Sequence, residues 1–344
     1  GGVGRYRRIC DEVRERDYLG FELAGSGKSS TNDGLVREIQ PDVEMLLDAM
    51  AMLNLPPIES MSPPDARMFM EMSSAVRPPG PEVGEIIDGM LPGADGPIEY
   101  RLYRPPTPGP HPVVVYYHGG GWVIGSHTSD DPLCRELCVK SNVVIVSVNY
   151  RHAPEHRFPA AADDSFAALQ WVAANAASLG GDPTRLAVAG WSAGGNVAAV
   201  AAQLARDNGG PSLKGQLLLT PAVDGSKEYP SMRENAEGYV LTKSLMDWFW
   251  DHYADPSDRS HPKASPLLAE SLANLPPAVV VTGQYDPLRD EGDAYAVALK
   301  AAGVPVQHIQ ARGHTHTSVG MVDVLPSGRP VRDQMAAALR GFFV

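Results

Sequence analysis

The chain has 344 residues, of which 43% are hydrophobic and 20% are charged, and its formal net charge is −12. This composition is typical of a globular protein with a substantial buried core and excludes a disordered chain. The acidic balance argues against nucleic acid as a partner, because nucleic-acid binding needs basic patches that displace counterions from phosphates. No apolar run reaches the roughly eighteen residues of a membrane-spanning helix, so we expect no membrane span.

The cysteines predict neither a disulfide framework nor a metal site. There are three, and Cys134 and Cys138 are spaced to lie on one helix face as buried small side chains. Reduced thiols indicate a cytoplasmic protein. The first residues carry no apolar signal core and no initiator Met, so a removed leader stays open. Residues 25–29 resemble the end of a phosphate-binding loop, but Glu22 stands where that loop needs a glycine.

Residues 1 to about 90 differ from the rest of the chain. Runs at 43–52 and 66–72 have helical spacing and several methionines, and Pro/Gly-rich stretches separate them. Methionine stripes are usually core, although flexible thioethers can also line an adaptable binding surface. We predict an N-terminal helical cap segment over 1–90.

From about residue 97 onward, short β-rich runs alternate with helical patterns. Strands are predicted at 98–103, 112–117, 143–148, 185–189, 216–219, 278–282 and 306–309, and helices at 160–174, 193–206, 292–302 and the C-terminus. Strands that alternate with helices of this length indicate an α/β fold with a mostly parallel sheet covered by helices on both faces. We assign this α/β domain to 91–344.

One interval interrupts the alternation. About sixty residues separate the strand near 219 from the strand near 278, and they include the aromatic run 248–253. Such an excursion in an α/β domain is usually functional. We predict a cap or lid insertion at about 221–265 that packs with the N-terminal helices over the carboxyl edge of the sheet.

Two glycine-rich motifs carry the predicted chemistry. Residues 190–194 read Gly-Trp-Ser-Ala-Gly between a buried strand and a helix of small residues, the setting in which Ser192 would project as a nucleophile at a helix N-terminus. Residues 118–122 read His-Gly-Gly-Gly-Trp after an apolar strand. Backbone N–H groups of such a loop, together with the N–H of Ala193, can stabilise an oxyanion.

A nucleophilic serine needs a base and a group that orients the base, in the chain order Ser, Asp or Glu, His. Asp286 follows the predicted strand 278–282, and Asp290 competes with it four residues later, where a helix N-cap is the plainer interpretation. His314 and His316 both lie in the next such loop. The residues alone do not choose between the two histidines.

With these motifs assembled, the chain resembles the hormone-sensitive-lipase-like family (family IV) of bacterial esterases, which have the α/β-hydrolase fold. Residues 118–122 match the family's HGGGW/F motif, 150–160 look like its YRLAPEHPFPA segment, and 286–292 match DPLRDEG. The late G-x-x-H motif falls on Gly313 and His316. The resemblance covers residues 97–344 and, more loosely, the N-terminal helices.

The resemblance implies that Asp286 is the triad acid and His316 the base, with Gly120 and Gly121 as oxyanion donors beside Ala193. It implies no cofactor and a small-molecule ester as partner, and it leaves a homodimer open. Short- to medium-chain carboxylic esters are the expected substrates. An amidase or acyltransferase on the same triad is the alternative enzyme, and a ligand-binding homologue that has lost catalysis is the alternative from another class.

The departures from the family pattern concern the pocket. Trp191 stands where the family usually has Asp or Thr, Thr317-Ser318 replace Gly-Phe after the base, and Asn149 replaces a common Asp. None of these removes a catalytic atom. The candidate pocket residues are Trp122, which follows the glycines, and Trp191, whose indole would narrow the acyl site or simply pack under the serine.

Overall fold

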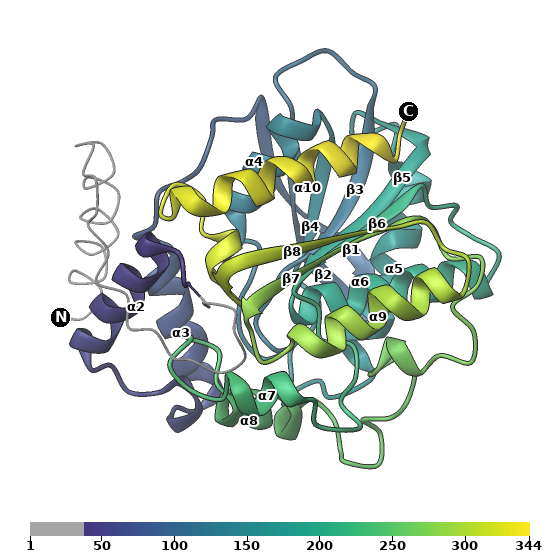
Figure 1. Ribbon diagram of the computed structural model, residues 1–344. Helices are drawn as coiled ribbons and strands as arrows, with labels where there is room; N and C mark the ends of the chain where they lie inside the picture. Colours follow the sequence, from purple (N-terminus) through teal and green to yellow (C-terminus); the bar gives the residue numbers. More distant parts are fainter. Residues whose placement is uncertain (1–37) are drawn as a thin grey trace.

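A single eight-stranded sheet runs through the part of the chain that the computed structural model describes, residues 38–344 (Figure 1). The strand order is β1-β2-β4-β3-β5-β6-β7-β8. β2 is antiparallel to both of its neighbours, and the other pairs are parallel. The bounds are β1 Glu85–Gly93, β2 Gly96–Arg104, β3 His111–Tyr117, β4 Val144–Val148, β5 Gly181–Trp191, β6 Gly215–Leu219, β7 Ala278–Tyr285 and β8 Val306–Thr315.

Helices connect the parallel strands and cover the sheet. The α-helices are α2 Pro41–Leu53, α3 Pro63–Ser74, α4 Asp131–Ser141, α5 Ala160–Asn175, α6 Ala193–Asp207, α7 Pro230–Glu234, α8 Lys243–Tyr253, α9 Arg289–Ala301 and α10 Arg329–Gly341. Short 3-10 turns are η1 Ile58–Ser60, η2 Pro266–Leu268, η3 Ser318–Gly320 and η4 Pro326–Gly328.

The apolar run of β3 explains why the sheet is buried on both faces. Successive side chains of a strand point to opposite faces. Val113 and Val115 accordingly belong to the core shared with α5, α6 and α9, whereas Val114 and Tyr116 belong to the core shared with α4 and α10. The predicted mostly parallel sheet with helices on both faces is confirmed.

A helical cap lies at one end of this sheet. In Figure 1, α2 and α3 from the N-terminal part lie beside α7 and α8, which the chain inserts between β6 and β7. Glu59 of η1 accepts hydrogen bonds from Thr242 and Ser244 at the start of α8, across 3.4 and 2.5 Å. These helices therefore come from two segments that are distant in sequence.

The domain limits stay a prediction. The expected limit near residue 90 falls inside β1, a strand that the sequence patterns did not indicate. Residues 1–37 of the predicted cap segment, including the phosphate-loop-like run 25–29, lie outside the described residues. Within residues 38–344, no helix combines the length and apolarity that crossing a bilayer requires. Cys134 and Cys138 are buried on α4, where burial raises the pKa of both thiols.

Candidate active site

Ser192 stands on a sharp turn between β5 and α6. β5 ends at Trp191 and α6 begins at Ala193, and the serine between them has φ +57°, a strained left-handed conformation. Gly194 packs so closely beneath β3 that a Cβ would lie 1.9 Å from the carbonyl oxygen of Tyr117. The turn thereby places the serine beyond the carboxyl ends of the parallel strands and at the N-terminus of a helix.

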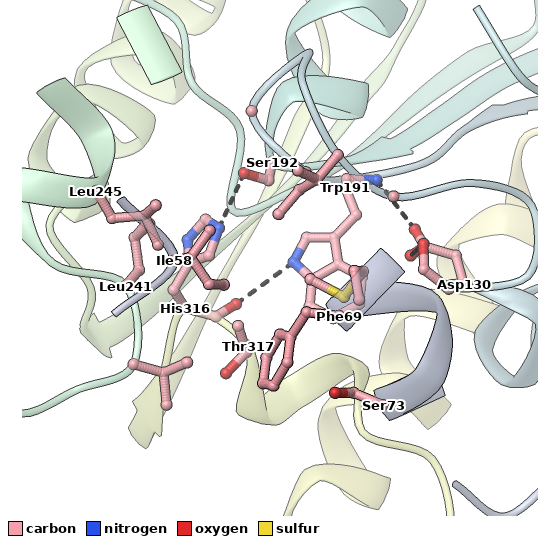
Figure 2. A pocket seen from close by; sticks show the side chains of 18 of the residues that line it. Ile58, Phe69, Ser73, Asp130, Trp191, Ser192, Leu241, Leu245, His316 and Thr317 are labelled. Carbon is pink, nitrogen blue, oxygen red and sulfur yellow. Dashed lines mark hydrogen bonds between the residues drawn. The ribbon is translucent and has the colours of Figure 1, made fainter. Parts of the chain in front are cut away.

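A chain of two hydrogen bonds joins Ser192, His316 and Asp286. The Ser192 hydroxyl donates to Nε2 of His316 across 2.9 Å, a bond that Figure 2 shows, and Nδ1–H of His316 donates to Oδ2 of Asp286 across 2.8 Å. Asp286 is fully buried, and its Oδ1 accepts from the Leu288 N–H at 2.8 Å. The backbone thus holds Oδ1, and Oδ2 remains directed at the imidazole.

The competing residues lie elsewhere. His314 is buried at the end of β8, where Nδ1 bonds the Ser318 hydroxyl at 3.0 Å and Nε2 bonds the Ser327 carbonyl at 3.2 Å. Both ring nitrogens are therefore occupied, and burial lowers the pKa of this histidine. Asp290 lies in the first turn of α9 and accepts from the Ser231 N–H at 2.8 Å. Neither residue has a hydrogen bond to Ser192 or His316.

The glycine loop after β3 presents unoccupied amides. The Gly119 N–H donates to Asp130 Oδ2 at 3.2 Å. Among the described residues, no hydrogen-bond acceptor pairs with the N–H groups of Gly120, Gly121 or Ala193. The Gly120 carbonyl accepts from the N–H groups of Val123 and Ile124, at 3.1 and 2.9 Å. Because a peptide unit is planar, this fixes the direction of the Gly121 N–H on the opposite side.

Buried side chains support the same loop. Nδ1–H of His118 donates to the Gly119 carbonyl at 2.7 Å, and Nε2 of His118 lies 3.3 Å from Nε2 of His152. Burial lowers the pKa of both histidines, which favours their uncharged forms. Asp130 also accepts from the Tyr116 hydroxyl at 2.7 Å. The sequence patterns did not single out His152 or Asp130, because their roles depend on contacts between distant segments.

A mostly apolar cavity of about 220 Å³ opens beside Ser192. Its walls come from the cap helices α2, α3 and α8, from the loop after β3 and from the loop after β8. Figure 2 shows that Ser192 and His316 lie at one side, with Asp130 and Ser73 at the other and Trp191 between them. Lining residues include Met50, Leu55, Ile58, Phe69, Met70, Ser73, Arg77, Leu241, Leu245, Phe249 and Met321.

Of the two candidate pocket tryptophans, only Trp191 lines the cavity. Its Nε1 donates to the His316 carbonyl at 3.4 Å. Its ring also packs tightly, since a Cβ on Gly320 would lie 2.6 Å from it. Trp122 is not among the residues that line this cavity, which corrects the expectation for it. Its backbone has φ +61°, and its indole is fully buried, stacked on Tyr253 at 4.2 Å and against Trp250 at 4.6 Å.

Glu291 is a buried carboxyl close to the acid of this site. Its Oε1 accepts from the N–H groups of Val223 and Asp224, at 2.7 and 3.3 Å, which ties α9 to the start of the cap insertion. Burial raises its pKa to about 8, with Asp224 and Asp286 adding to the effect. The sequence motif contained this residue, but only the structure gives it a contact.

These features define a hydrolase of the α/β type, and comparison with known families agrees. The sequence profile of a family described as the alpha/beta hydrolase fold matches residues 114–319. The chain belongs to this family and, within it, to the hormone-sensitive-lipase-like esterases.

The relatives are ester hydrolases. Carboxylesterase NlhH of Mycobacterium tuberculosis is 41% identical over 88% of this chain and 96% of its own length, and an ethyl acetate hydrolase of Pseudomonas putida is 39% identical over 78% and 87%. The structure of ester hydrolase EH1AB1 from the metagenome of Lake Arreo, in complex with a bipyridine phosphonate derivative, has a TM-score of 0.85. It is 40% identical over 89% of this chain and 99% of that one. This chain is accordingly a carboxylic ester hydrolase.

Proposed function

We propose that Ser192, His316 and Asp286 act as the catalytic triad of this carboxylesterase. The observation that carries the proposal is the pair of hydrogen bonds at 2.9 and 2.8 Å that links the three side chains. As Ser192 Oγ attacks the ester carbonyl carbon, its proton passes to Nε2 of His316. Asp286 holds the imidazole in the required tautomer and stabilises the imidazolium that forms.

The carbonyl oxygen becomes an oxyanion during this attack. The N–H groups of Gly120, Gly121 and Ala193 are the proposed donors, since each lacks an acceptor among the described residues. Gly120 and Gly121 line the same cavity as Ser192, and Ala193 directly follows it. Donors fixed before the reaction stabilise the developing charge without reorganisation, and the loss of one costs on the order of 10²–10³ in rate.

The tetrahedral intermediate then collapses to an acyl-enzyme. The C–O bond to the alcohol breaks, and the alkoxide takes the proton from Nε2 of His316. Water enters, gives a proton to the same nitrogen and attacks the acyl carbon, and the carboxylic acid leaves as Ser192 recovers its proton. One histidine therefore serves both half-reactions.

Esters with short- to medium-chain acyl groups are the proposed substrates, and the size of the cavity supports this choice. Its volume of about 220 Å³ lies below the roughly 300–1,000 Å³ of pockets that hold drug-sized ligands. Its walls are mainly apolar, which favours alkyl groups over charged ones. The ethyl acetate hydrolase among the relatives supports a short acyl chain.

The test is hydrolysis of p-nitrophenyl esters from acetate to dodecanoate by the wild type and by Ser192→Ala. Loss of a triad nucleophile lowers kcat by about 10⁶, and the wild type should prefer acyl chains of eight carbons or fewer. Matched p-nitroanilides test amide cleavage. Equal turnover of esters by both proteins would overturn the triad, and a preference for dodecanoate would overturn the chain-length proposal alone.

A further inference from the structure

Helix α3 is hydrogen-bonded at two points to the loop that carries the glycine amides. Nε of Arg67 donates to the Val123 carbonyl at 2.7 Å. Glu71, one turn later, accepts from the Ser126 hydroxyl at 2.5 Å. Residues four apart lie on the same helix face. One face of α3 is therefore hydrogen-bonded to the loop on both sides of Ile124.

The guanidinium of Arg67 also reaches a second loop. Its Nη2 donates to the Ala153 carbonyl at 2.8 Å, and its two terminal nitrogens bond Glu155 at 2.9 and 2.6 Å. The Ala153 N–H in turn donates to the Trp122 carbonyl at 2.9 Å. The bond to Arg67 lowers the pKa of Glu155 to about 2, so this ion pair stays charged at ordinary assay pH. The planar guanidinium of arginine has enough donors to bond two carbonyls and a carboxylate at once, whereas the ammonium of a lysine does not have this geometry.

Two hydrogen bonds separate Arg67 from the Gly121 amide. Arg67 holds the carbonyl of Val123, and the N–H of Val123 holds the carbonyl of Gly120 at 3.1 Å. The Gly120 carbonyl and the Gly121 N–H share one planar peptide unit and point in opposite directions. A shift of Val123 would therefore turn the Gly121 N–H away from its present direction.

The same helix forms a wall of the substrate cavity. Phe69, Met70 and Ser73 of α3 line it, while Arg67 and Glu71 hold the glycine loop. An acyl group that presses on α3 is thus in contact with the element that fixes the loop.

We propose that Arg67 is a positioning residue for the oxyanion hole, through which the cap helix α3 sets the direction of the Gly121 amide. This inference rests on the catalytic role proposed above for that amide. Arg67 touches no reacting atom, so its removal should weaken binding of the oxyanion and leave ground-state binding unchanged.

The experiment compares Arg67→Met with the wild type in three measurements. These are kcat and KM for p-nitrophenyl butyrate, Ki for an alkyl trifluoromethyl ketone, and Ki for 1-hexanol. Ser192 adds to the fluoroketone carbonyl to leave an oxyanion, whereas the alcohol forms none. Misplacing a catalytic donor by about 1 Å costs up to roughly 10²-fold. We expect kcat to fall about 10- to 100-fold, the fluoroketone Ki to rise by the same factor, and KM and the hexanol Ki to stay within about twofold.

Arg104→Met is the matched control. Arg104 also donates to a backbone carbonyl, that of Leu179 at 2.9 Å, and also pairs with a glutamate, Glu85. Its side chain is 30% exposed, against 26% for Arg67. Leu179 precedes β5, at the end of that strand opposite Ser192. Arg104→Met should therefore lower the melting temperature without changing the fluoroketone Ki.

Arg67→Lys and Glu71→Ala extend the comparison and replace Arg67→Met if that variant does not fold. Lysine can reach one carbonyl but not both carbonyls and Glu155, so it should restore only part of kcat. The proposal is overturned if the Arg67 variants keep the wild-type fluoroketone Ki, or if the hexanol Ki and KM rise in parallel with it. If Ser192→Ala keeps its turnover, the triad fails instead.

Discussion

Gly121 of the glycine loop lies directly against the ring of Phe249 in the cap. A Cβ on Gly121 would lie 2.1 Å from Cγ of Phe249 in α8, and the residue has φ +58°. A Cβ on Gly120, which has φ +120°, would lie 2.1 Å from the carbonyl oxygen of Ile124. A side chain thus opposes a Cβ at Gly121, whereas backbone opposes one at Gly120. We predict that Phe249→Ala rescues Gly121→Ala and fails to rescue Gly120→Ala.

The magnitudes follow from these contacts. A left-handed backbone costs an L-residue about 1–2 kcal/mol, and overpacking a filled core costs about 1–3 kcal/mol more. Phe249 is only 4% exposed, so Phe249→Ala by itself should cost about 3–5 kcal/mol. If the ring is the obstacle, the double variant escapes the overpacking cost. The two substitutions should then show a favourable coupling of about 1–3 kcal/mol in the free energy of unfolding.

The turnover number kcat gives a second measure of the clash between the Cβ that Gly121→Ala adds and the Phe249 ring. Displacing the Gly121 N–H removes one proposed oxyanion donor, so Gly121→Ala should lower kcat by about 10²–10³. Removing the Phe249 ring should recover at least about tenfold of that loss, because the backbone can then relax toward its original path.

The assays are equilibrium unfolding in urea and turnover of p-nitrophenyl butyrate, applied to the wild type, the three single variants and the two double variants. Additive free energies for Gly121→Ala with Phe249→Ala would refute the reasoning. So would a coupling of equal size for Gly120→Ala, because the ring does not oppose a Cβ at that position.

Three further outcomes are expected. His316→Ala should lower kcat by on the order of 10⁶, whereas His314→Ala should cost about 1–3 kcal/mol of stability, measured by urea unfolding, and change kcat only a few-fold. Trp191→Ala should extend the preferred acyl length in the p-nitrophenyl ester series, and an unchanged profile would assign the indole to packing alone. Burial raises the pKa of Glu291 from its ordinary 4.5 to about 8, so wild-type stability should fall as pH rises between these values. Glu291→Gln should flatten that slope in unfolding measured at pH 5 and pH 8.

The central strands were predictable because they are buried on both faces and therefore read as continuous apolar runs. β3 and β4 are examples in which every side chain is buried. β1 was missed for the opposite reason. It contains a proline and two glycines, and only Leu91 of its residues is buried. Among the strands of residues 38–344 it pairs only with β2, at the edge of the sheet. Its existence depends on a neighbouring strand, which no local pattern records.

The site divides in the same way. Ser192 and the glycine loop could be found from local motifs, because a tight turn demands particular residues at fixed spacing. Between His314 and His316 the local pattern was undecided, since the two differ only in what surrounds them. His314 faces Ser318 and Ser327, and His316 faces Asp286. Trp122 was misplaced because its neighbours in sequence line the cavity, while its left-handed backbone turns its own ring toward α8.

The cap does more than shape the cavity, because its two segments contact the glycine loop by different means. Phe249 of the insertion packs on Gly121, and Arg67 of the N-terminal segment holds Val123 by a hydrogen bond. Met70 and Leu241 also line the cavity, but their apolar side chains do not hydrogen-bond to the loop. Substitutions at Met70 and Leu241 should therefore change KM among acyl chains. Substitutions at Phe249 and Arg67 should change kcat even for acetate, whose acyl group is too short to test the cavity walls.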